Sequence, residues 1–249
     1  MPHEPIFNVP SVIIALLGAL MLVHLVRIFV LTGPQDIEFL LLFAFIPARY
    51  DATVLLGGQL PGGVSAQIWT FVTYAFLHAS WMHLIVNAIW LLPFGSAVAR
   101  RFGALRFLLF FAVTAAAGAL MQFAVRPGAE FTMIGASAAI SGTMAGAMRF
   151  VFQRGGPLGF ARGIDDQAFR MPALPLSGVL RDPRVLGFLA AWFGVNLLFG
   201  IGEFSVGGGG QPVAWQAHIG GFLAGLFLFG LFDPVDPGAT PSTIDATRP

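Results

Sequence analysis

Four polar residues in an otherwise apolar sequence are of types that carry out nucleophilic chemistry on a carbonyl group. They are Ser137, His218, His83 and Asn87. A serine hydroxyl becomes a strong nucleophile when an imidazole takes its proton, and amide, imidazole and backbone N–H groups can stabilise the oxyanion that follows. The residue types therefore predict Ser137 as the nucleophile and His218 as the general base. Asn87, His83 and the Ser137 backbone N–H are the predicted oxyanion donors.

The spacing of these residues supports a shared site. His83 and Asn87 are four residues apart, which places both on one face of a helix. His218 lies three residues before Gly221, and so near the same helix face as that small residue. No Asp or Glu occurs within the long apolar segments. The sequence therefore predicts a Ser–His dyad rather than a triad with a carboxylate.

Each polar residue also has a purely structural explanation. Ser137 could cap the N-terminus of a helix, and Asn87 could form a hydrogen bond between helices. Ser141 is interpreted as a packing serine that bonds back to its own helix. His78 and His83 are five residues apart and have no carboxylates nearby in the sequence. This spacing does not fit a zinc site, so no metal is expected.

The composition places the chain in a membrane. Of the 249 residues, 57% are hydrophobic and 10% are charged, with a mean hydropathy of +0.81. Soluble proteins carry roughly a quarter of charged residues. The net charge of +1 leaves no basic excess for binding nucleic acid. The absence of cysteine excludes disulfides and thiolate chemistry, and nothing in the sequence requires a cofactor.

The apolar segments predict an all-α, polytopic membrane bundle of six transmembrane helices, since about 20 apolar residues cross a bilayer. The six segments are Val12–Leu31, Trp81–Val98, Phe107–Val125, Ser137–Phe152, Leu186–Gly202 and Trp215–Phe232. Between Gly33 and Ser80 the chain is too polar to span, yet it holds two apolar stretches. We therefore predict a first loop that is partly inserted in the membrane. Residues 1–232 form one membrane domain, and residues 233–249 form a polar tail that is expected to be disordered.

The placement of arginine orients the predicted helices. The segments after the second and fourth helices, with their flanks, hold nine arginines: Arg100, Arg101, Arg106, Arg149, Arg154, Arg162, Arg170, Arg181 and Arg184. The loops on the other side hold Arg49 and Arg126. Because cytoplasmic loops are enriched in Lys and Arg, the arginine-rich loops and both termini are predicted to be cytoplasmic. Arg27, near the outer end of the first helix, is expected to snorkel to the interface.

This orientation brings the four candidate residues to one depth, because all of them lie near the outer ends of helices that run inward. Small residues four positions apart allow helix backbones to approach closely. Two such pairs occur, Gly142 with Gly146 and Gly221 with Gly225. The sequence therefore predicts that the second, fourth and sixth helices pack together around one site just below the outer surface.

Several motifs resemble those of the rhomboid family of intramembrane serine proteases. They are the segment Trp69–Ala79, the element His83-x-x-x-Asn87, the motif Gly135-Ala136-Ser137 and the motif Ala217-His218-x-x-Gly221-x-x-x-Gly225. The resemblance covers roughly Pro47 to Asp233. It implies a Ser–His dyad, oxyanion stabilisation by His83 and Asn87, and cleavage of transmembrane substrates near the outer surface.

The chain differs from the family pattern at three positions. Ala138 stands where glycine is usual, Ser141 where an aromatic residue is frequent, and Ala99 where glutamate is usual. The first two bear on activity and specificity, and the third bears on stability.

We therefore expect an intramembrane serine endopeptidase, surrounded by membrane lipid, that needs no cofactor. Its substrates are expected to be transmembrane helices weakened by Gly, Pro or polar residues, because peptide bonds in an intact helix are already hydrogen-bonded. The short loops and the resemblance to the family point to a bacterial inner membrane. Two alternatives stay open. One is a catalytically inactive rhomboid-like protein that binds client helices, and the other is a transporter that uses His78, His83 and His218 along a proton or metal path.

Overall fold

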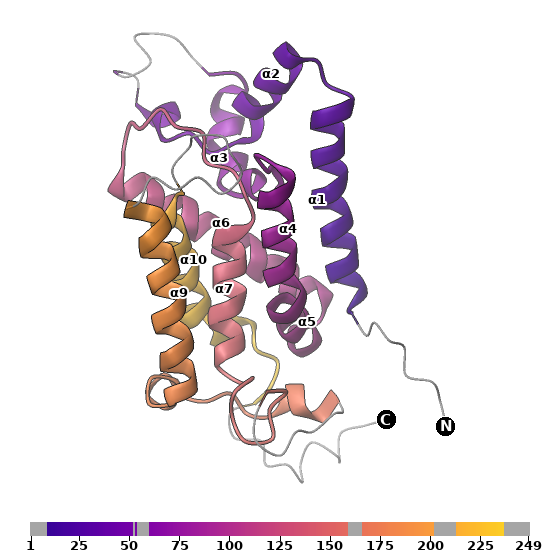
Figure 1. Cartoon of the computed structure of the whole chain (residues 1–249), viewed down its shortest axis with the longest axis vertical. Coiled ribbons are helices and arrows are strands. Elements are labelled where there is room, and N and C mark those ends of the chain that lie inside the picture. The colour runs from indigo at the N-terminus through magenta and orange to yellow at the C-terminus, as the bar shows by residue number, and fades with distance from the viewer. Residues whose placement is uncertain (1–8, 52, 54–59, 159–165, 202–212, 237–249) are drawn as a thin grey trace.

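The computed structural model describes residues 9–51, 53, 60–158, 166–201 and 213–236, and these residues form a helical bundle (Figure 1). Within these ranges no strand is formed beyond an isolated bridge between Phe45 and Met133. The α-helices are α1 Ser11–Phe29, α2 Gly33–Phe43, α3 Gly63–Thr73, α4 Trp81–Trp90, α5 Ser96–Phe102, α6 Ala104–Val125, α7 Ser137–Met148, α8 Leu176–Val179, α9 Pro183–Ile201 and α10 Trp215–Phe232. Short helical turns are η1 Pro47–Tyr50, η2 Tyr74–Phe76, η3 Leu91–Gly95 and η4 Asp166–Arg170.

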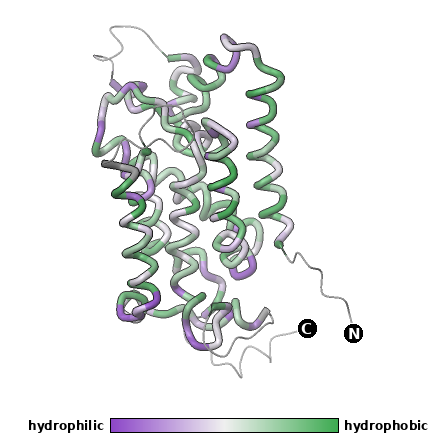
Figure 2. Tube along the Cα trace, viewed as in Figure 1, coloured by the Kyte–Doolittle hydropathy of each residue, from purple (hydrophilic) through white to green (hydrophobic). Residues whose placement is uncertain are grey.

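Four helical stretches among the described residues are long and apolar enough to cross a membrane. They are α1, the continuous stretch Trp81–Phe102 formed by α4, η3 and α5, then α6, and α10. Helix α9 contributes a shorter apolar stretch, Pro183–Leu198. Figure 2 shows apolar residues along these helices and hydrophilic residues concentrated toward the two ends of the bundle.

The predicted boundaries need correction in four segments. The fourth segment was expected to reach Phe152, but α7 ends at Met148 and has 12 residues. Helix α9 begins at Pro183, three residues earlier than predicted, where the Asp182 carboxylate accepts a hydrogen bond from the backbone N–H of Arg184 at 2.9 Å. The second stretch continues to Phe102, and α6 starts at Ala104. Length and composition therefore identify four of the six predicted spans.

Helix α7 lies in the centre of the bundle, where every residue from Ala138 to Met148 is buried. Its neighbours approach closely because small residues face one another. A Cβ atom at Gly225 of α10 would overlap the carbonyl oxygen of Gly142, and one at Gly221 would overlap the carbonyl of Ala138. The predicted close packing of the fourth and sixth segments through small residues is therefore confirmed.

The described parts of the segment between α1 and α4 contain the helices α2 and α3 and the short turns η1 and η2. The Trp69 indole N–H donates to the Leu42 carbonyl at 2.9 Å, and the Thr73 hydroxyl donates to the Phe43 carbonyl at 2.7 Å. These contacts hold α3 against the end of α2. Insertion of this loop into the membrane stays a prediction.

Arg27 was expected to snorkel, and the structure gives it fixed partners instead. Its guanidinium pairs with the Asp36 carboxylate at 2.7 Å and donates to the carbonyl of His78 at 2.8 Å. A paired charge costs less near the apolar phase than a single one. The pair also ties the end of α1 to the start of α2 and to the segment that precedes α4.

A second arginine organises the opposite end of the bundle. The Arg101 side chain is fully buried, pairs with Asp233 at 2.8 Å, and donates to the carbonyls of Phe169 and Met171 at 2.8 and 2.7 Å. Its guanidinium also lies 4.7 Å from the centre of the Phe150 ring. Asp233 therefore belongs to the folded unit rather than to a disordered tail. Residues 234–236 of the predicted tail are also described, and residues 237–249 lie outside the described residues.

The contact between α7 and α10 generates a stability prediction. We expect Gly225→Ala to destabilise the protein by about 1–3 kcal/mol, because the added methyl group meets backbone that cannot move aside easily. Gly230→Ala is the matched control, since a Cβ atom there meets nothing within 4 Å. Thermal unfolding of both variants in detergent measures the difference. Equal midpoints would contradict the close approach of the two helices.

Candidate active site

The structure places Ser137 and His218 in direct contact. Ser137 is the first residue of α7, and His218 lies in the first turn of α10. The Ser137 hydroxyl oxygen is 2.7 Å from Nε2 of His218, which is within hydrogen-bond distance for proton transfer. These residues are 81 positions apart in the sequence. The close packing of α7 on α10 therefore creates this pair.

The segment that leads into α7 is held in place by backbone hydrogen bonds. Met133 exchanges two backbone hydrogen bonds with Phe45, at 3.1 and 2.9 Å, and the Gly135 N–H donates to the Tyr74 carbonyl at 3.0 Å. Tyr74 is itself buried, and its hydroxyl donates to the Ala115 carbonyl at 2.8 Å. The loop that precedes Ser137 is thus bonded to the region between α1 and α4. These bonds limit the positions that Ser137 can take.

His83 and Asn87 lie one turn apart on α4, as the spacing predicts. Ser80 caps the N-terminus of this helix, and its hydroxyl accepts a hydrogen bond from the His83 N–H at 3.2 Å. The Asn87 side-chain amide donates to the His83 carbonyl at 3.0 Å. Because an amide NH₂ group has two donors, one N–H of Asn87 stays available for another acceptor.

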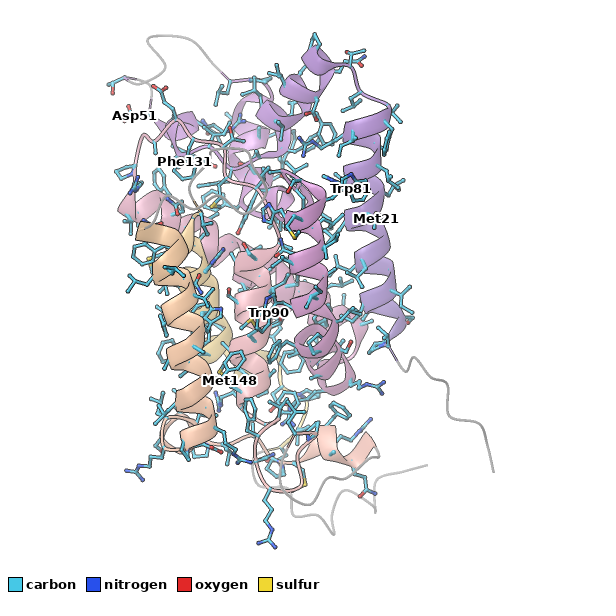
Figure 3. The ribbon with its side chains drawn as sticks, viewed as in Figure 1. Met21, Asp51, Trp81, Trp90, Phe131 and Met148 are labelled. Carbon is cyan, nitrogen blue, oxygen red and sulfur yellow. The ribbon has the colours of Figure 1, made fainter. Side chains whose placement is uncertain are left out.

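All four candidate residues line one cavity of about 250 Å³, together with Gly135 and Ala138. They come from three separate helices, α4, α7 and α10, so the predicted convergence is observed. Phe131 belongs to the same lining, and Figure 3 shows it in the segment beyond the upper end of α7, while Met148 lies at the other end of that helix. The cavity therefore lies at the end of α7 that begins with Ser137.

Ser141 is not part of this pair. Its hydroxyl donates to the Ser137 carbonyl at 2.7 Å, four residues back along the same helix. This is the local back-bonding that the sequence indicated. Ser141 also lines a second cavity of about 250 Å³, which lies between α4, α7 and α9 and reaches both Ser137 and His218.

The second cavity is largely apolar and extends to the side of the bundle. Its lining includes Val86 and Trp90 of α4 and Val195 of α9, which are 36%, 40% and 52% exposed. An apolar path with exposed edges connects the Ser–His pair to the faces of α4 and α9 that would meet lipid.

Asn196 of α9 is a site residue that the sequence analysis missed. Its side-chain oxygen is 2.5 Å from Nδ1 of His218, on the side of the ring opposite Ser137. The signal was present, because an asparagine within the apolar stretch of α9 is costly unless it has a partner. A carboxylate was the only third member weighed from the sequence, and the long apolar segments contain none.

The described residues contain no group of three or more His, Cys, Asp or Glu side chains that could hold a metal ion. The rings of His78 and His83 are 5.1 Å apart and meet edge to face. This arrangement is a packing contact between rings.

Gly135 generates a prediction about the position of His83. Its φ of +118° is unfavourable for residues with a side chain, and a Cβ atom there would lie 2.6 Å from Nε2 of His83. Gly135→Ala should therefore cost the backbone strain, roughly 1–3 kcal/mol, plus the collision with the imidazole. In a His83→Ala background only the strain remains, so the same substitution should cost less. Thermal unfolding of the four proteins measures this coupling, and an equal cost in both backgrounds would contradict the contact.

Comparison with known proteins assigns the family. A family model described as Rhomboid domain matches residues 65–233. Rhomboid protease GlpG of Haemophilus influenzae is 25% identical over 172 residues, which cover 68% of this chain and 71% of that protein. Rhomboid-like protease 3 of Toxoplasma gondii is 29% identical over 188 residues, which cover 74% of this chain and 59% of that protein. The match extends over more than half of the chain and includes all four candidate residues, so the chain belongs to the rhomboid family. Together with the four long apolar helical stretches, this makes it an integral membrane protein.

Proposed function

We propose that this protein is an intramembrane serine endopeptidase in which Ser137 is the nucleophile and His218 is the general base. The observation that carries the proposal is the 2.7 Å contact between the Ser137 hydroxyl and Nε2 of His218. The names of the relatives, both proteases, support the same reaction class.

The proposed reaction uses each residue of the cavity. The Ser137 oxygen attacks the carbonyl carbon of the scissile bond while Nε2 of His218 accepts the hydroxyl proton. Asn87, His83 and the Ser137 backbone N–H stabilise the oxyanion. The C–N bond then breaks, and His218 returns its proton to the departing amine. Water attacks the remaining ester, again with His218 as base, and restores the Ser137 hydroxyl.

The proposed substrates are transmembrane proteins. The apolar cavity between α4 and α9 offers a route by which a substrate segment could approach from the lipid. A segment must expose its peptide carbonyl to Ser137, so helices weakened by Gly, Pro or polar residues are favoured. The reaction uses side chains and backbone N–H groups alone, and the proposal includes no cofactor.

The two alternative functions are weaker. An inactive client-binding protein does not need a serine and an imidazole at hydrogen-bond distance, and this chain has both. A His-lined transporter would need a continuous polar path, but His218 lies beside Asn196 and Ser137 in cavities with mainly apolar linings.

The activity is tested with the purified full chain in detergent and a model type I membrane protein as substrate. Wild-type protein should cleave the substrate and should be labelled by a fluorophosphonate probe. Ser137→Ala should lose both, with a rate lower by several powers of ten, because the nucleophile of a coupled pair is gone. Ser141→Ala is the matched control and should keep the label. Cleavage that survives Ser137→Ala and is lost in Ser141→Ala would show that the nucleophile is Ser141.

We further propose six spans, with both termini in the cytoplasm of a bacterial cell and the site near the outer interface. Figure 1 supports one part of this arrangement, since the start of α1 lies at the same end of the bundle as α8, whereas α2 and α3 lie at the other end. Ser65 of α3 and Ser177 of α8 are both exposed.

The orientation can be tested because the chain has no native cysteine. An impermeant thiol reagent added to intact cells should label Ser65→Cys and leave Ser177→Cys unlabelled until the cells are opened. The two residue positions control for each other. Reversed labelling would move the proposed cleavage site to the cytoplasmic face.

A further inference from the structure

Asn196 occupies a position from which it can control the catalytic histidine. It lies on α9, is 8% exposed, and touches His218 through its side-chain oxygen at 2.5 Å. Its side-chain nitrogen donates to the Trp192 carbonyl, one turn earlier in the same helix, at 2.8 Å. Both ends of the amide are therefore engaged.

These two contacts fix the orientation of the amide. A carbonyl oxygen such as that of Trp192 can only accept, so the Asn196 atom that faces it must be the nitrogen. The atom that faces His218 is then the oxygen, which is also an acceptor. Nδ1 of His218 must consequently carry a hydrogen, and in the neutral ring Nε2 carries none. Nε2 is the atom that faces the Ser137 hydroxyl.

Packing around Trp192 holds Asn196 in place. The Trp192 ring stacks on Phe222 of α10, with ring centres 4.9 Å apart. Phe222 lies one turn beyond His218 on the same helix. The Trp192–Phe222 stack and the Asn196–His218 contact thus join α9 to α10 at two successive turns, and the geometry of the ring depends on both helices.

We propose that Asn196 is a positioning residue, which holds His218 as the Nδ1–H tautomer with Nε2 directed at Ser137, so that the working unit is Ser–His–Asn. The effect of Asn196 on the cleavage rate rests on the proposed function. The tautomer of His218 does not depend on that function. Without Asn196 the neutral ring can place its hydrogen on either nitrogen and can rotate. A base with its hydrogen on Nε2 cannot accept a proton from Ser137.

The tautomer is tested on the full-length protein in detergent with ¹⁵N-labelled histidine. The chain has five histidines, so His218→Ala assigns the resonances of His218 by difference. Wild-type protein should show one protonated nitrogen, Nδ1, and one unprotonated nitrogen, Nε2. Asn196→Leu should show a mixture or the reversed pattern. A wild-type ring protonated at Nε2 would overturn the proposal whether or not the protein cleaves any substrate.

Kinetics on the model substrate test the consequence. Asn196→Leu should lower kcat on the order of 100-fold, as expected for a misplaced catalytic group, with KM unchanged. Asn196→Asp keeps an acceptor at the same place and should recover most of kcat at pH values above its acid limb. Its carboxylate favours the protonated imidazole, so the acid limb of its kcat profile should move to higher pH, which a purely structural role would not cause. Leu198→Ala, at a position that is 59% exposed on the same helix, is the control and should match wild type.

The outcomes separate the two proposals. If the wild-type protein cleaves the substrate and Asn196→Leu has the same kcat, the positioning role is overturned and the proposed protease function stands. A wild-type protein that does not cleave overturns the proposed function, while the tautomer still decides the role of Asn196. If Asn196→Leu does not fold, the pH profile of Asn196→Asp and the wild-type spectrum give the answer.

Discussion

The site depends on how closely the backbones of α7 and α10 approach each other. Gly221 and Gly225 face the carbonyls of Ala138 and Gly142 at distances that exclude a side chain. Without water to drive apolar surfaces together, helices in lipid associate through such close packing. Ser137 and His218 sit at the same end of these two helices, and their contact at 2.7 Å follows from the approach of the backbones. A small separation of the two helices would break the Ser137–His218 hydrogen bond. The apolar area that each helix buries would change little.

Several polar side chains inside the bundle share one kind of hydrogen bond, to a carbonyl one turn earlier in their own helix. This bond lowers the cost of burying them. Ser141, Asn87 and Asn196 each donate to the carbonyl four residues earlier in their own helix. Thr114 and Thr143 donate to carbonyls within the preceding turn. An unsatisfied donor in an apolar interior costs several kcal/mol, so local bonding removes most of this cost. For the two asparagines it also fixes the direction of the amide, since one end is anchored and the other is presented to the site.

Sequence reasoning reached the convergent residues because they belong to short motifs with fixed spacing. His83 and Asn87 share a helix face, and the glycines near His218 indicate close helix packing. The sequence therefore predicts that these residues line one shared site. Sequence reasoning failed where the partner residue belongs to no such motif. Nothing next to Asn196 marks it as a neighbour of His218, which is 22 positions away on another helix. Arg27 likewise pairs with Asp36, and Arg101 with Asp233, only once the chain is folded. Counting charges in the sequence therefore does not predict that these arginines are buried.

The use of an amide rather than a carboxylate beside His218 follows from the surroundings. A buried carboxylate near lipid would have to be desolvated, at a cost of several kcal/mol, and would hold the imidazole in its protonated form before the reaction. A neutral amide orients the ring through the same hydrogen bond and avoids both effects. It stabilises the imidazolium of the transition state less than a carboxylate would, because its oxygen carries only a partial charge. Under the proposed function, the arrangement therefore favours an imidazole that is neutral and correctly oriented before the reaction begins.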